Sequence, residues 1–188
     1  MGIFLTIFLI CGIMLAGFKD LKSSKIPNSI TFSMMATGLV WHGVMDGVAG
    51  LGFSASGLFT GICIFLIPYI MGGMGAGDVK LMGAVGSIIG TKGGVIAAVL
   101  SILLGFVYAL ALLIIHFDYT RFLFRRIGIT LKTAIFTGNL IYIPVDKDEE
   151  RLYLKFGLPI VIGTMGYMVL KYTGSNLIQN ILGLSFGI

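Results

Sequence analysis

Two aspartates offer the clearest candidate chemistry in this sequence. Asp78 follows the closely spaced Gly75 and Gly77 directly after a long apolar run, and Asp20 follows the first apolar run of the chain. A carboxylate at the end of a membrane-length apolar segment is energetically costly, so a functional role is the default interpretation. Two carboxyl groups brought close together share one proton, so one acts as a base and the other as an acid. Such a pair can activate water for attack on a peptide carbonyl without a metal.

The residues beside the acids have both functional and structural interpretations. Gly75 and Gly77 would let an extended substrate backbone approach Asp78, and they permit φ values closed to other residues; alternatively, they are flexible loop residues. Lys22 and Lys80 each follow an aspartate by two positions. Each lysine either favours the ionised acid or anchors its helix among lipid headgroups, and we prefer anchoring.

The segment "KIPNS", Lys25 to Ser29, predicts the start of a helix. Pro27 fits near the first helical turn, and either Asn28 or Ser29 can cap the exposed amides. This turn would also help to aim the first aspartate at the second.

The composition is that of an integral membrane protein. Of the 188 residues, 57% are hydrophobic and 11% are charged, against about 25% charged in soluble domains, and the mean hydropathy is +1.03. The apolar runs lack the strict alternation of barrel strands, so an all-α bundle is predicted. Six segments approach spanning length: 2–18, 28–45, 55–71, 79–91, 93–116 and 157–170. The fourth, at roughly 13 residues against about 20 for a full span, must be tilted, thin the surrounding bilayer or be shielded by other helices.

The basic residues predict the orientation of these spans. With the N-terminus outside, Lys92 and Lys171 are the outside exceptions among 13 lysines and arginines, and the rest are cytoplasmic. Asp20 ends the first span and Asp78 begins the fourth, so two complete crossings separate them. An even number of crossings returns the chain to the same face, which places both acids at the cytoplasmic end of the bundle.

Other candidate functions receive less support. Cys11 and Cys63 lie inside apolar runs without a CxxC or Cys/His cluster, so neither a metal site nor a cofactor is expected. The sequence pI of about 9.3 comes from basic residues that flank apolar segments, which indicates membrane orientation and not nucleic-acid binding. We predict a single membrane-embedded domain, 1–188, in which 117–157 forms a cytoplasmic or interfacial segment in contact with lipid.

Two motifs resemble a known family. "DLKSSKIPN", from Asp20 to Asn28, and "GAGDVKL", from Gly75 to Leu81, are together similar to the type IV prepilin peptidase and preflagellin peptidase family of GxGD membrane aspartyl proteases. The resemblance covers roughly residues 1 to 110. It implies that Asp20 and Asp78 form a catalytic pair. It also implies an endopeptidase of the cytoplasmic membrane that removes a short basic leader from a membrane-inserted prepilin-like or preflagellin-like precursor at the cytoplasmic face.

The sequence departs from the larger members of that family in one respect. Those members also methylate the trimmed pilin and carry an additional cytoplasmic segment between the first two spans; Lys19 to Pro27 is too short for it. Methyl transfer is therefore not predicted. A small proton-coupled transporter using intramembrane aspartates is the alternative, and an inert scaffold is a third. Neither the oligomeric state nor the acid that holds the shared proton is predicted.

Overall fold

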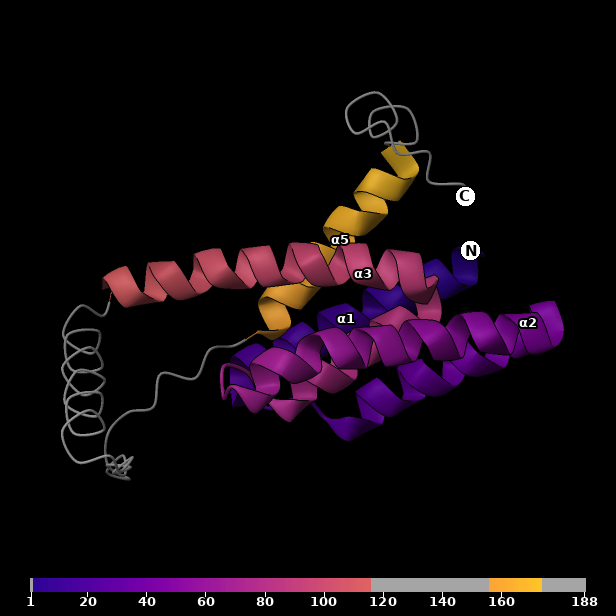
Figure 1. Cartoon of the computed structure of the whole chain (residues 1–188), viewed down its shortest axis with the longest axis horizontal. Helices are drawn as coiled ribbons and strands as arrows, with labels where there is room; N and C mark the ends of the chain where they lie inside the picture. The colour runs from indigo at the N-terminus through magenta and orange to yellow at the C-terminus, as the bar shows by residue number, and fades with distance from the viewer. Residues whose placement is uncertain (1, 116–155, 174–188) are drawn as a thin grey trace, which may run out of the picture. The chain divides into compact units, whose positions relative to one another are not determined.

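The computed structural model describes residues 2–115 and 156–173, and these residues are helical apart from short connections (Figure 1). The helices are α1 (Ile3–Ser23), α2 (Asn28–Ile70), α3 (Ala76–Ile115) and α5 (Gly157–Thr173). The predicted all-α class is confirmed. Helices α1, α2 and α3 are long and apolar enough to cross a membrane, so the chain is a multi-pass membrane protein. Six crossings and an outside N-terminus remain predictions.

The chain divides into two compact units, Met1–Gly105 with Leu154–Ile188, and Phe106–Tyr153. In the second unit, the described residues 106–115 form the last part of α3. All contacts discussed below lie within the first unit. The prediction of one domain over the whole chain remains a prediction.

Helix α2 reverses direction at Gly47. As one straight helix, its 43 residues would extend about 65 Å, twice the thickness of a bilayer core. Gly47 instead has φ 62° and ψ −140°, a conformation that favours glycine. A Cβ on Gly43 would lie 2.8 Å from Leu51 Cδ2, although eight residues along one helix are about 12 Å apart. Figure 1 shows α2 running to one end and doubling back, as the predicted break between 45 and 55 requires.

Helix α3 has a similar reversal at Gly90, whose φ is 77°. A Cβ on Gly94 would lie 3.4 Å from the Cα of Gly86, eight residues earlier. The sequence predicts a break between 91 and 93, and the structure places it at the glycine just before. The described helices therefore provide the short, reversing segments that the apolar runs indicate.

The first segment of α3 forms the centre of the core. Residues 81–90 are all buried, which confirms that other helices shield this short segment. Helix α2 packs closely against it at small residues. A Cβ on Gly57 would overlap the carbonyl oxygen of Gly86, and a Cβ on Gly86 would overlap that of Gly57. The buried Ser54 hydroxyl donates a 2.7 Å hydrogen bond to the Ser87 carbonyl oxygen, which also joins the two helices.

Helix α5 packs against α1 and against the second segment of α3. A Cβ on Gly17 of α1 would lie 2.8 Å from Val161 Cγ2. A Cβ on Gly163 of α5 would lie 2.6 Å from the Ser101 backbone nitrogen. These close approaches fix α5 beside the end of α1 where Asp20 lies.

Candidate active site

Asp20 lies in the last turn of α1 and is buried, with 6% of its surface exposed. The helix ends just after it, because Ser24 adopts a left-handed conformation and donates its N–H to the Asp20 carbonyl oxygen at 2.8 Å. The C-terminal end of a helix disfavours a negative charge. The first amide of another helix offsets this effect, since the Gly157 N–H donates to Asp20 Oδ2 at 3.0 Å.

Asp78 lies in the first turn of α3 and is 5% exposed. Its Oδ2 accepts a 3.1 Å hydrogen bond from the Gly75 N–H, and its own N–H donates to the Gly75 carbonyl oxygen at 3.1 Å. These are the contacts of an acidic residue at the third position of a helix, where a negative charge is favourable. Asp78 Oδ1 is buried and has no hydrogen-bond partner among the residues that the structure describes.

The two carboxyl groups lie within electrostatic reach of each other, since the charge of Asp20 acts on Asp78. They come from different helices and from positions 58 residues apart in the chain. The fold therefore brings together the two acids that the predicted topology assigns to the same end of the bundle. Burial strengthens their interaction, because little water remains to screen it.

The two glycines have different surroundings. Gly75 directly precedes α3, whereas Gly77 lies inside its first turn and not in a loop. Neither glycine has a positive φ. In the segment that joins α2 to α3, Gly72 has a positive φ, at 77°. A Cβ on Gly77 would lie 3.1 Å from the Cβ of Ile26. Gly77 thus allows the connection between α1 and α2 to lie against the helix that carries Asp78.

The two lysines also differ. Lys22 is exposed in the last turn of α1. The Lys80 ammonium donates a 2.9 Å hydrogen bond to Asn28 Oδ1 and lies 5.5 Å from the centre of the Phe32 ring. Lys80 therefore joins the starts of α3 and α2, a role that the sequence did not indicate.

The predicted side-chain cap of α2 is wrong. Pro27 occupies the N-cap position, and no side chain makes a capping hydrogen bond there. The Pro27 carbonyl oxygen accepts from the Ile30 N–H at 3.1 Å. Asn28, expected as one of two possible caps, instead uses its side-chain oxygen for Lys80.

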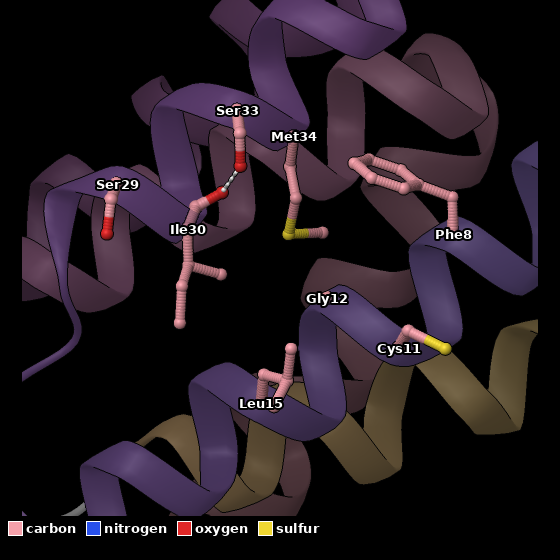
Figure 2. Close-up of a pocket in the computed structure, with 8 residues that line it drawn as sticks. All are labelled: Phe8, Cys11, Gly12, Leu15, Ser29, Ile30, Ser33 and Met34. Atoms are coloured by element: carbon pink, nitrogen blue, oxygen red, sulfur yellow. Dashed lines mark hydrogen bonds between the residues drawn. The ribbon is translucent and has the colours of Figure 1, made fainter.

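A hollow of about 210 Å³ lies between α1 and the start of α2, and Figure 2 shows the side chains around it. Its polar groups are few, and the Ser33 hydroxyl is already used in a 2.9 Å hydrogen bond to the Ile30 carbonyl oxygen. The hollow therefore offers an apolar surface and no acid–base chemistry. Its lining residues are Phe8, Cys11, Gly12, Leu15, Ser29, Ile30, Ser33 and Met34.

Sequence reasoning missed Gly157 as a site residue. The predicted topology contained a signal for it, because span 157–170 begins at the same face as both aspartates. That signal places a helix N-terminus near the acids but does not identify the amide that contacts one of them. In the parts of the chain that the structure describes, no cluster of three or more His, Cys, Asp or Glu side chains is arranged to hold a metal ion.

Comparison with models of known protein families gives a match. Residues 7–110, more than half of the chain, match the model of the type IV leader peptidase family. No curated protein and no solved structure shows significant similarity to the chain.

Proposed function

Because the chain belongs to the type IV leader peptidase family, we propose that it is a membrane aspartyl endopeptidase in which Asp20 and Asp78 are the catalytic pair. Family membership implies cleavage of leader peptides from prepilin-like substrates. The finer proposal is that the precursor is inserted in the membrane, carries a short basic leader, and is cut at the cytoplasmic face. Prepilin-like and preflagellin-like precursors are the two substrate classes that this proposal includes.

One observation carries the proposal: two buried carboxyl groups from different helices interact electrostatically, and Asp78 Oδ1 has no hydrogen-bond partner in the described part of the chain. Buried carboxyl groups are normally fully hydrogen-bonded or paired with cations. Two buried acids that interact in this way favour sharing a proton. It is also the arrangement that general acid–base hydrolysis requires.

The proposed reaction needs water and the peptide alone. The ionised carboxylate takes a proton from water as the water oxygen bonds to the scissile carbonyl carbon, and the protonated acid gives its proton to the carbonyl oxygen. The resulting diol is neutral. As the C–N bond breaks, the amine nitrogen takes the proton now held by the first acid, and one diol hydroxyl returns its proton to the second acid. The pair ends with one proton, as it began.

The surroundings of Asp78 support access for an extended peptide. Gly75 presents no side chain beside the acid, and a Cβ there would lie 3.4 Å from Asp78 Oδ2. Because residue 75 is glycine, no side chain of this residue covers Asp78 Oδ2. We propose that the substrate backbone approaches from this side.

The test is coexpression of the wild-type protein, D20N or D78N with a prepilin-like precursor, followed by measurement of precursor size. Each substitution is expected to lower processing by about 100- to 10,000-fold, because it removes a general acid or base. D46N is the matched control, since the Asp46 side chain is 66% exposed and faces His42. Processing that survives in D20N or D78N at wild-type protein levels would remove that acid from the catalytic role.

A further inference from the structure

The first amide of α5 contacts one of the two acids from outside the part of the chain that matches the family. The Gly157 N–H donates to Asp20 Oδ2 at 3.0 Å, whereas the match ends at residue 110. We infer that Gly157 is a positioning residue whose backbone amide holds Asp20 as the ionised base, leaving Asp78 as the proton donor. This inference rests on the proposed peptidase function and assigns the roles within its catalytic pair.

The contact requires glycine because of space. A Cβ on residue 157 would lie 2.7 Å from Asp20 Oδ2, 2.8 Å from its Cβ and 3.0 Å from its Cγ. Gly157 is not among the described glycines with positive φ, so its backbone conformation alone does not demand glycine. Any larger residue would push Asp20 away from the amide or move the start of α5.

The amide is available because it begins a helix. The first amides of an α-helix have no partner within the helix, and they favour a nearby negative charge. The bond to Asp20 therefore satisfies a donor that would otherwise need water or another partner. Helix α5 is held in place by contacts elsewhere along it, including Gly17 with Val161 and Gly163 with Ser101.

The two acids differ in what surrounds their oxygens. Asp20 accepts its hydrogen bond from the Gly157 N–H, which belongs to a separate helix and lies 137 positions later in the sequence. Asp78 receives one from its own helix start, and its Oδ1 is buried without a partner. A buried oxygen without a partner costs much more when it is charged than when it is protonated. The helix ends favour the opposite arrangement, a charge on Asp78 and a proton on Asp20, but their effect is smaller than the cost of a buried charged oxygen without a donor. The resting proton is therefore assigned to Asp78.

In the proposed reaction, Asp20 accordingly takes the proton from the attacking water. Asp78 gives its proton to the carbonyl oxygen of the scissile peptide bond. During breakdown of the diol, the proton on Asp20 passes to the leaving amine and a diol proton returns to Asp78. The Gly157 amide stays bonded to Asp20 Oδ2 and does not exchange its proton with the substrate.

The decisive variant removes the donor without adding an atom near Asp20. Cell-free translation into nanodiscs can replace Gly157 with glycolic acid, which changes the backbone amide to an ester. The kcat for cleavage of a purified prepilin-like precursor is expected to fall about 10- to 100-fold, the size expected for a hydrogen bond to a charged group. KM is expected to change less than about 3-fold, because the Gly157 amide contacts Asp20 and is not expected to contact the substrate.

The pH profile distinguishes a positioning role from a structural one. A carboxylate that loses a donor is harder to keep ionised, so the acidic limb of the kcat profile should move to higher pH in the Gly157 ester. The matched control is the ester at Ile160, whose N–H donates to the Phe156 carbonyl oxygen at 3.1 Å. That ester weakens the same helix without contacting Asp20, and its pH profile should match that of the wild type.

Side-chain variants give an independent comparison. G157A is expected to lose cleavage at least as strongly as the ester, because its Cβ displaces Asp20. G166A is its control in the same helix, since a Cβ there would lie 3.6 Å from Leu100 Cδ1, an ordinary contact. If G157A fails to accumulate in the membrane, the ester variant still decides the question.

The outcomes separate this inference from the proposed function. An ester at Gly157 with wild-type kcat and pH profile would overturn the inference while the peptidase function stands. Equal losses in both esters without a shifted acidic limb would also overturn it, since they indicate helix weakening alone. A wild-type protein that leaves the precursor uncut would remove the proposed function itself.

Discussion

A single methyl group at the contact between α2 and α3 should disturb the candidate site from a distance. Gly86 lies two helical turns beyond Asp78 on α3, and a Cβ there would overlap the Gly57 carbonyl oxygen and lie 2.8 Å from its carbonyl carbon. Unstrained carbon atoms are about 3.5–4.0 Å apart, so α3 would have to retreat by about 1 Å. The obstructing atoms are backbone and cannot rotate away.

The expected penalty for G86A is about 1–3 kcal/mol in unfolding free energy, the usual range for overpacking. Because a displacement of about 1 Å at a catalytic group can lower a rate by up to about 100-fold, precursor cleavage should fall as well. The control is G52A, since Gly52 lies in α2 with nothing within 4 Å of a Cβ. G52A should be neutral or slightly stabilising, as alanine favours a helix over glycine.

Stability would be measured by detergent-induced unfolding followed by circular dichroism, and activity by precursor cleavage in nanodiscs. The double variant G57A/G86A adds a second test. Both methyl groups enter the same contact, so once one has separated the helices the second should cost less than it does alone. G86A with the stability and activity of G52A would refute the close packing of α2 on α3.

Three further predictions concern the contacts around the site. K80M should lower the unfolding free energy, measured by detergent unfolding, by less than about 1 kcal/mol, because the Lys80 bond to Asn28 is solvent-exposed. N28A should lower it by the same amount, and the double variant K80M/N28A should lower it no further than either single variant. S54A should cost about 1–3 kcal/mol, because the buried Ser54 hydroxyl is the donor to the Ser87 carbonyl oxygen; an unchanged unfolding midpoint would contradict this. The cleavage rate should pass through a maximum with pH, falling where both acids are protonated and where both are ionised; a rate that rises across the whole range would exclude a pair that works with one proton.

The sequence predicted the helical class, the breaks and the meeting of the two acids for related reasons. Apolar runs separated by glycines and charges leave few alternatives to membrane helices. The breaks at Gly47 and Gly90 fall in or beside the predicted connections, because a chain that must reverse needs a residue tolerant of positive φ. Counting crossings then assigns Asp20 and Asp78 to one end of the bundle without knowledge of side-chain contacts.

The individual contacts at the site could not be predicted in the same way. The bonds from Lys80 to Asn28 and from Gly157 to Asp20 join residues 52 and 137 positions apart. Such pairs depend on how the helices rotate about their axes, and hydropathy does not determine that rotation. Asn28 illustrates the difficulty, since a helix-start residue that normally caps its own helix is used by another helix instead.

The central claim is that Asp20 and Asp78 act as one catalytic unit, and purified variants test it most directly. Cleavage of a prepilin-like precursor would be measured in single turnovers for the wild type, D20N, D78N and the double variant D20N/D78N. Groups that act as a unit give losses that do not add, so each single variant should be as inactive as the double. Losses that multiply in the double variant, or activity retained in either single variant, would contradict the claim.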